Sequence, residues 1–404
     1  MIYFTDEKLL ETEFIRKENQ QKAIWCIGLL TLLLTIIICF GLSCLYSATY
    51  VNRNNSLFLS QITSLLVAFT ASACTIFLGT KKITSWINPI LIIMLAVLFY
   101  TATCTPKING AHRWLFIKLG SHSISIQPSE LMKVVLVLWL SNFLGKNQHY
   151  MTIHPWKRVI FPAGGIMACP IMLVLAGKDY GTTALLLAVT ACMLYAAGFK
   201  LRYLLPLSGV FLFGAYEYIK RNDPTRYNRI LLFRTPEQYA QNETMQQWYS
   251  ILALGSGGWV GQGFSESRLK WDFLPESESD FILSVAGEEF GFLVMLMLII
   301  IYLFLGFLGI TIGTMAKSIR DKYIAFGMSI FILMQAMINL GVISCAFPTK
   351  GMPAPFISFG GTNMMACLIG VSCIISIALD IAIPNYTERL RDKVLPRKKK
   401  MLNK

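Results

Sequence analysis

Long apolar runs recur along almost the whole of this chain, and they restrict its fold more than any other feature. A helix needs about 20 apolar residues to cross the hydrocarbon core of a bilayer. Ten segments meet this requirement: 24–46, 58–79, 85–104, 128–145, 159–176, 181–199, 203–219, 281–312, 323–346 and 355–384. The sequence therefore predicts an all-α integral membrane protein with about ten transmembrane helices.

The composition excludes an ordinary soluble fold. Hydrophobic residues make up 55% of the 404 residues and charged residues 14%, whereas about 25% of the residues of a soluble domain are charged. Most of the ten cysteines lie inside apolar runs, where they behave as small hydrophobic residues. The net charge of +14 comes without a basic groove interleaved with aromatic residues. We therefore expect the membrane as a partner, and no nucleic acid.

The positions of Lys and Arg orient the predicted bundle. If the N-terminus lies inside, 22 of these residues fall on the inner side and six in the short outer loops. Positive charges accumulate on the cytoplasmic side, so both termini are predicted to be cytoplasmic. This divides the chain into an N-terminal segment (1–23), a membrane domain (24–384) and a basic tail (385–404). The long connection 220–280, between the seventh and eighth spans, is then extracytoplasmic.

Ionisable residues inside or beside a span are candidates for function, because a charge is expensive in lipid. Glu130 and Lys133 are three residues apart at the start of the fourth span, so they share one helix face and can pair. A structural ion pair and a lysine directed at a diphosphate are both open interpretations. Asp179 lies in a tight outer turn, where a plain turn and a ligand site are equally compatible with the sequence.

Two further places lie at the predicted outer ends of the spans. Asp280 stands where the long connection becomes apolar helix; a partly desolvated carboxylate binds a proton more readily and can act as a general base. A role as the N-cap of the eighth span is compatible with this. The segment 348–363 contains Lys350 and several prolines and glycines. Such irregular backbone lines a cavity or allows tight helix packing.

Part of the long connection has the pattern of an amphipathic helix. Residues 245, 248, 249, 252 and 253 are apolar and would form one stripe, with Trp248 and Tyr249 suited to the head-group zone. The sequence Gly-Ser-Gly-Gly at 255–258 predicts the end of this helix. It also suggests a flexible hinge that would let 259–280 move as a lid.

Together these residues predict an outward-opening polar cavity containing Lys133, Glu130, Asp179, Asp280 and Lys350. An enzyme acting on lipid head groups needs such a cavity, and so does a transporter.

Six sequence blocks resemble, in order, those of the SEDS family of bacterial shape, elongation, division and sporulation proteins (FtsW, RodA, SpoVE). NGAHRW resembles the family's NGARRW, QPSELMK its QPSELAK, and GKDYGT its QPDLGT. The remaining blocks are LPESESDFIL for LPEAHTDFIF, GEEFG for GEELG, and PTKGMPAPFISFGG for PTKGLPLPFISYGG. The PTKG and ISFGG blocks, with the polar stretch before the first span, favour the division-type FtsW or SpoVE branch over RodA.

The resemblance implies a peptidoglycan glycosyltransferase at the outer face of the bacterial cytoplasmic membrane. Its substrate would be lipid II, an undecaprenyl-diphosphate-linked disaccharide peptide. Its partners would be a class B penicillin-binding transpeptidase and other divisome or elongasome proteins. A lipid II flippase and a scaffold that recruits partners are the alternatives. The flippase has no need of a base at Asp280, and the scaffold leaves Glu130 and Lys133 unexplained.

The resemblance also assigns roles to single residues. Asp280 matches the family's catalytic aspartate, which would accept a proton from the attacking sugar hydroxyl. The positions that match substrate-binding motifs are Arg113, Glu130, Lys133, Asp179, Lys350, Ser358, Gly360 and Gly361. Lys133, Arg113 or a divalent cation would meet the charge of the leaving diphosphate, and no metal site is assigned. Lys178 departs from the family, because it stands where the motif has proline.

Overall fold

The computed structural model describes residues 3–50, 55–107, 110–119, 122–154, 156–239, 244–270, 277–349, 351–384 and 386–394. Within these residues the chain is almost entirely helical, as the sequence predicts. The helices of the first half are α1 (Tyr3–Tyr50), α2 (Asn55–Ser85), α3 (Ile87–Cys104), α4 (Pro128–Ile153), the π-helix η1 (Trp156–Ile160), α5 (Phe161–Ala176), α6 (Tyr180–Ala196) and α7 (Leu201–Asn222). Those of the second half are α8 (Pro224–Leu232), the 3₁₀ helix η2 (Pro236–Tyr239), α9 (Met245–Gly257), α10 (Ile282–Met315), α11 (Ile319–Ile343), α12 (Gly361–Ala382) and α13 (Tyr386–Val394).

Seven helical segments are long and apolar enough to cross a membrane. They are Glu13–Thr49, Ser56–Ser85, Ile87–Cys104, Trp156–Ala176, Ile282–Met315, Ile319–Ile343 and Gly361–Ala382. α6 is apolar but shorter, and α4 and α7 carry charged residues among their apolar ones. The chain is therefore a multi-pass membrane protein, and a total of ten spans requires α4, α6 and α7 to cross as well.

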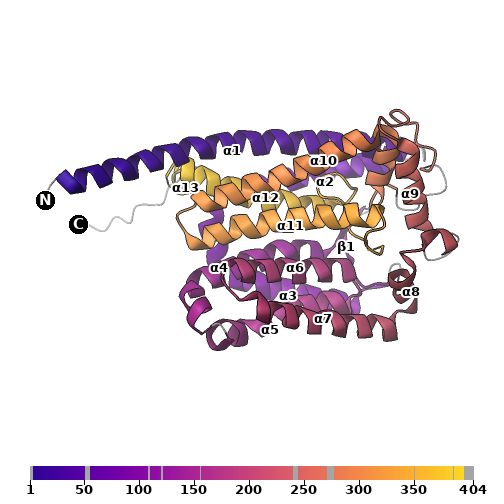
Figure 1. Ribbon diagram of the computed structural model, residues 1–404, viewed down its shortest axis with the longest axis horizontal. Coiled ribbons are helices and arrows are strands. Elements are labelled where there is room, and N and C mark those ends of the chain that lie inside the picture. The colour runs from indigo at the N-terminus through magenta and orange to yellow at the C-terminus, as the bar shows by residue number, and fades with distance from the viewer. Residues whose placement is uncertain are drawn as a thin grey trace.

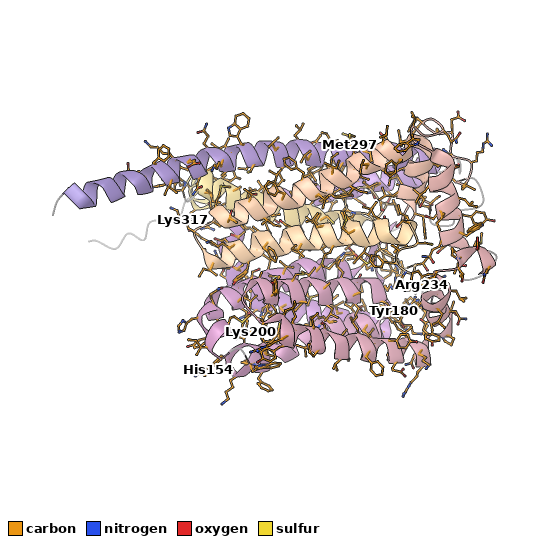
Figure 2. All side chains as sticks on the ribbon, in the orientation of Figure 1. His154, Tyr180, Lys200, Arg234, Met297 and Lys317 are labelled. Carbon is orange, nitrogen blue, oxygen red and sulfur yellow. The ribbon has the colours of Figure 1, made fainter. Side chains whose placement is uncertain are left out.

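The long helices lie side by side, with their ends at two opposite poles of the bundle. α1 begins and α13 lies at one pole, whereas α8 and α9 lie at the other (Figure 1). Lys200 and Lys317 lie at the first pole and Tyr180 and Arg234 at the second (Figure 2). This separation agrees with the charge count, which places Lys200 and Lys317 on the inner side and the long connection on the outer side.

A two-stranded antiparallel hairpin interrupts the helices, and the all-α prediction missed it. β1 (Leu115–Leu119) pairs with β2 (His122–Ile126), with Leu115 opposite Ile126. The alternation of serine and isoleucine in 123–126 is the period-2 pattern of a strand. This pattern is present in the sequence, but it is short and lies between two long apolar runs.

α10 contains a break at Gly291, and a loop of the long connection fills it. Gly291 has φ 76° and ψ −178°, so the helix loses regular hydrogen bonds there. Backbone N–H groups of Phe292 and Leu293 donate instead to the carbonyls of Gly258 and Trp259, at 2.9 and 3.2 Å. Gly261 approaches the same place so closely that a methyl group on it would lie 2.2 Å from the carbonyl oxygen of Glu289. Backbone hydrogen bonds therefore connect the break in α10 to the loop that follows α9.

A buried ion pair holds the same loop to α1 and α10. Lys270 Nζ lies 2.8 Å from Glu289 Oε1, and both side chains are fully buried. The Ser47 hydroxyl on α1 donates to Glu289 at 2.5 Å and accepts from Lys270 at 2.9 Å. Glu288 accepts from the Ser267 hydroxyl at 2.5 Å. The two glutamates of the GEEFG block thus bind the connection 258–270 to the helix ends.

The amphipathic helix predicted within the connection is present as α9, and most of its predicted apolar stripe lies away from the face that packs on the bundle. The buried residues of α9 are Gln247, Ser250, Ala253 and Gly257, whereas Leu252 is 40% exposed. Ser250 bonds to Ser284 on α10 and to the carbonyl of Ile343 on α11, both at 2.7 Å. α9 packs through its small and polar side, because close helix contacts favour small residues that carry hydrogen bonds.

The predicted end of α9 is confirmed, since the helix stops at Gly257 and Gly258 has φ 54°. These glycines do not have the packing expected of a flexible hinge. A methyl group on Gly257 would lie 2.1 Å from the carbonyl oxygen of Gly287 on α10. Gly257 is therefore a packing contact between two helices, and the segment after it is fixed at the Gly291 break.

We predict that Gly257→Ala destabilises the protein by about 1–3 kcal/mol or more, as overpacking does in a tight core. Gly255→Ala is the matched control, because a methyl group there meets nothing within 4 Å. It should be neutral or stabilising by about 0.5–1 kcal/mol, since alanine favours helix over glycine. Thermal unfolding of both variants in detergent tests this, and equal midpoints would contradict the packing role.

Candidate active site

A cavity of about 1400 Å³ lies at the pole that carries the long connection. Its walls come from α2, α6, α7, α8, α12, the β-hairpin, the turn before α10 and the segment after α11. Of the predicted site residues, Asp280, Arg113, Gly360 and Gly361 line it. The walls combine charged groups with apolar side chains such as Phe211 and Leu212 of α7. The cavity can therefore hold a molecule with a charged head and an apolar part.

Asp280 lies in the turn that leads into α10 and faces the cavity. The N-cap position of α10 is Phe281, with no side-chain cap, so Asp280 does not serve as the N-cap. Its backbone carbonyl accepts a hydrogen bond from the Asn339 side chain on α11 at 2.9 Å. A methyl group on Gly351 would lie 3.2 Å from Asp280 Oδ2 and 3.3 Å from Arg113 Nη1. Asp280 and Arg113 therefore approach the same point from two sides.

Positive charges gather around the backbone carbonyl of Lys178. Guanidinium groups of Arg113 and Arg226 each donate to this oxygen at 2.6 Å. Lys178 itself has φ 60°, a left-handed conformation that turns its carbonyl toward both arginines. Burial and the charge of Arg113 lower the pKa of Arg226. The two cations are thus crowded, and an anion would relieve their repulsion.

Lys178, Arg113, Arg226 and Arg229 form a cation cluster in which positive charge exceeds negative charge. Asp223 lies 3.4 Å from Arg226 and 3.9 Å from Lys178, and Asp179 lies 3.9 Å from Arg113. With Arg229, which also lines the cavity, four cations face the carboxylates of Asp179 and Asp223 and, beside Arg113, that of Asp280. Nε of Arg113 and of Arg229 is buried without a hydrogen-bond partner in the described residues. This surplus suits a doubly charged group such as a diphosphate.

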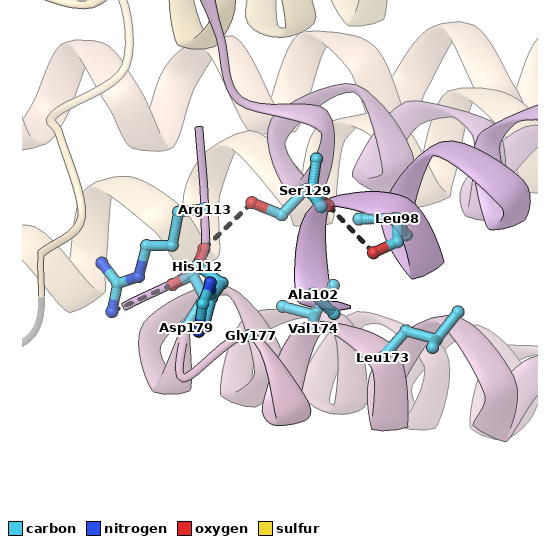
Figure 3. Close-up of a pocket in the computed structure, with 10 residues that line it drawn as sticks. Leu98, Ala102, His112, Arg113, Ser129, Leu173, Val174, Gly177 and Asp179 are labelled. Atoms are coloured by element: carbon cyan, nitrogen blue, oxygen red, sulfur yellow. Dashed lines mark hydrogen bonds and ion pairs between the residues drawn. The ribbon is translucent and has the colours of Figure 1, made fainter. Parts of the chain in front are cut away.

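Asp179 is a structural centre beside the cation cluster. It is the N-cap of α6, accepting from the Thr182 N–H at 3.3 Å, and it also accepts from Ser129 Oγ at 2.9 Å and Gln127 Nε2 at 3.0 Å. Burial alone would raise the pKa of Asp179, but Arg113 and these hydrogen bonds hold it below its ordinary value. Asp179 thus contacts both Arg113 and Ser129, as Figure 3 shows.

Glu130 and Lys133 form the predicted pair, but neither lines the cavity. Lys133 Nζ lies 2.5 Å from Glu130 Oε2, with both side chains buried. Lys133 also donates to Gln335 Oε1 on α11 at 2.8 Å. Each charge thus has its partners inside the bundle. The prediction that Lys133, Glu130 and Asp179 share the open cavity is wrong, because the pairing removes their charges from its surface.

Hydrogen bonds from a side chain of α2 fix the segment that follows α11. Gln61 on α2 accepts from the Gly360 N–H at 3.2 Å and donates to the Ser358 carbonyl at 3.4 Å. The buried Ser358 hydroxyl accepts from the Ala354 N–H at 2.7 Å, so it stabilises the turn 354–358. A methyl group on Gly361 would lie 2.7 Å from Ser64 Oγ, which reflects tight packing of α12 on α2. Lys350 lies outside the described residues.

Several residues of the site escaped the sequence analysis. Arg226 and Arg229 are in a long connection, where charged residues are common and give no signal. Gln335 and Asn339 lie inside a predicted span, where polar side chains mark function or packing, so a signal existed for them. No group of three His, Cys, Asp or Glu side chains that could hold a metal ion occurs in the part of the chain that the structure describes.

The apolar helices, the cavity and the cation cluster define a multi-pass membrane protein with a positively charged cavity at one pole. The profile of the FtsW, RodA and SpoVE family of cell cycle proteins matches residues 21–381. The chain belongs to this family.

Individual relatives agree with this assignment. The chain is 31% identical over 351 residues to the "Probable peptidoglycan glycosyltransferase FtsW" of Geobacter sp. (strain M18), covering 85% of this chain and 94% of that protein. It is 30% identical over 270 residues to stage V sporulation protein E of Bacillus subtilis (strain 168), covering 67% of this chain and 72% of that protein.

Two solved structures share the fold. One belongs to a peptidoglycan synthase complex described as coordinating polymerization and crosslinking; it has a TM-score of 0.71, 22% identity, and coverage of 87% of this chain and 97% of that one. The other is the rod shape determining protein RodA of Thermus thermophilus, with a TM-score of 0.64, 23% identity, and coverage of 87% and 96%.

We predict that Lys133→Met destabilises the protein by about 3–5 kcal/mol, because it leaves the Glu130 carboxylate buried and unpaired. The double variant Lys133→Met/Glu130→Gln removes both charges and should recover much of this loss. Thermal unfolding in detergent measures both effects. A double variant no more stable than the single one would show that the ion pair is not the main function of these residues.

Proposed function

We propose that this protein is a peptidoglycan glycosyltransferase that polymerises lipid II at the outer face of the bacterial cytoplasmic membrane. The observation that carries the proposal is the pairing, in one cavity, of the Asp280 carboxylate with a surplus of cations around Lys178. Glycosyl transfer from a diphosphate needs a base on one side of the reacting carbon and positive charge on the other. The cavity offers both, together with apolar walls suited to a polyprenyl chain.

The proposed reaction is an inverting displacement. Asp280 accepts the proton of the acceptor GlcNAc 4-hydroxyl while its oxygen attacks the anomeric carbon of the donor MurNAc. The bond from that carbon to the diphosphate breaks, and undecaprenyl diphosphate leaves with the bonding electrons. Arg113, Arg226 and Arg229 stabilise the negative charge of the leaving group.

The orientation and the partners follow from the same proposal. The pole with α8 and α9 lies on the outer side, with ten spans between it and a cytoplasmic pole that carries both termini. A class B penicillin-binding transpeptidase would use the glycan strands that this protein makes. Support comes from the fold shared with the chain of a peptidoglycan synthase complex. The FtsW relatives favour the division branch over RodA. A flippase does not account for a carboxylate facing the cation cluster.

We predict that Asp280→Asn lowers polymerisation of labelled lipid II about 10²–10⁴-fold, as loss of a general base does. The matched control is Glu278→Gln, which removes a charge from the same turn at a residue that does not line the cavity. It should polymerise at nearly the rate of the unmodified protein. Gel analysis of the glycan products, with the transpeptidase present, gives both rates. Near-normal synthesis by Asp280→Asn would rule out the assigned base.

We predict that Arg226→Ala lowers kcat/KM for lipid II about tenfold or more, because a hydrogen bond to a charged group is worth about 1.5–3 kcal/mol. Arg221→Ala is the control, since the Arg221 side chain is 79% exposed and pairs with Glu217 on its own helix at 3.7 Å. It should leave kcat/KM unchanged. Equal kcat/KM for the two variants would remove Arg226 from the diphosphate site.

A further inference from the structure

The side chain of Asn339 joins two segments that meet at the cavity. Its Nδ2 donates to the backbone carbonyl of Asp280 at 2.9 Å and to that of Met352 at 2.8 Å. Both amide hydrogens are therefore used, one on each segment. Asn339 is 1% exposed, so water does not compete for these bonds.

One helical turn earlier, Gln335 performs a similar task. Its Nε2 donates to the carbonyl of Pro353 at 2.8 Å and to Asn363 Oδ1 at 2.7 Å, while its Oε1 accepts from Lys133. Residues four apart lie on the same helix face. The two amides of α11 thus connect the cavity wall to the buried Lys133 and, through it, to α4.

Stability alone does not explain an asparagine at position 339. Its Oδ1 is buried and has no hydrogen-bond partner in the described residues, and such an atom costs folding free energy. Asparagine offers, however, two N–H groups on one atom, which can hold two carbonyls a fixed distance apart. The cost of the unsatisfied oxygen therefore needs an explanation, and the two hydrogen bonds from Nδ2 provide one.

The two segments that Asn339 joins form one edge of the reaction site. Asp280 lies on the first, and Gly351 precedes Met352 on the second. A methyl group on Gly351 would be 3.2 Å from the Asp280 carboxylate and 3.3 Å from Arg113, closer than most carbon contacts. A methyl group at 351 would therefore displace the carboxylate or the guanidinium by a few tenths of an ångström.

We infer that Asn339 is a positioning residue for the reaction. Its amide keeps the Asp280 turn in register with the Gly351 segment, so that the carboxylate faces Arg113 across Gly351 at the separation that the sugar transfer requires. Asn339 touches no substrate, and it acts on turnover rather than on binding. The inference rests on the proposed function, because it takes Asp280 as the base.

The experiment compares Asn339→Ala with Gln247→Ala in lipid II polymerisation, with the transpeptidase present. Gln247 on α9 is the matched control, since it is fully buried, donates to the Phe347 carbonyl at 2.8 Å, and also has an unpartnered side-chain oxygen. A displacement of a reacting group by about 1 Å can cost about 100-fold in rate. We therefore expect kcat of Asn339→Ala to fall about 100-fold with KM unchanged, and kcat of Gln247→Ala to stay near normal.

Thermal unfolding of both variants separates positioning from stability. Similar midpoints with a loss of kcat only in Asn339→Ala support the inference. Equal kcat in both variants overturns it and leaves the proposed function intact, provided that Asp280→Asn is inactive. Absence of polymerisation by the unmodified protein counts against the proposed function instead.

Gly351→Ala tests the same separation if Asn339→Ala does not fold. Gly351 is exposed and its φ lies outside the left-handed region, so alanine is compatible with the backbone. The added methyl group should push the Asp280 carboxylate and Arg113 apart by a few tenths of an ångström and lower kcat several-fold. Normal turnover in Gly351→Ala would overturn the inference by itself.

Discussion

The ammonium group of Lys133 is buried in the middle of the bundle, and much of the site depends on how its charge is satisfied. An isolated charge in a low-dielectric interior is very costly, so Glu130 and Gln335 must remain within hydrogen-bond reach of it. This requirement fixes α4 against α11. Gln335 then holds Pro353 and Asn363, which places the segment after α11 against the start of α12. A buried charge thus organises an active-site wall that it does not itself form.

Buried backbone groups at the start of α10 likewise depend on partners from elsewhere in the chain. A helix broken at Gly291 has N–H groups that need acceptors, and a membrane protein can supply them only from its own chain. The loop 258–263 does so, and the pair Lys270–Glu289 holds it in place. The start of α10 and the loop 258–270 are therefore held together by hydrogen bonds and a buried ion pair. Movement of a lid about the glycines after α9 is not supported by this packing.

The sequence predicted the features that depend on composition and on strong motifs. Apolar runs predicted the helices, the border of the eighth run predicted Asp280, and the motif resemblance predicted Arg113. The face of α9 that packs on α10 and α11 was not predicted, because it carries Ser250 and Gly257, which hydropathy does not identify as buried. Arg226 joins the site only because α8 folds back onto the α5–α6 turn. Neither the pairing of Lys133 with Gln335 nor that of Asn339 with Asp280 follows from spacing along the chain, since the partners are far apart in it.

Lys178 shows how a single dihedral angle limits which residues can replace one another. Proline, which the related motif has at this place, has φ near −65°, whereas Lys178 has φ 60°. Exchange of one residue for the other would rotate the carbonyl that Arg113 and Arg226 share. The conformation of Lys178 is therefore one that the proline form of the motif cannot adopt. Replacing Lys178 with proline would therefore remove one positive charge from the cavity and, at the same time, reorient the carbonyl that holds two others.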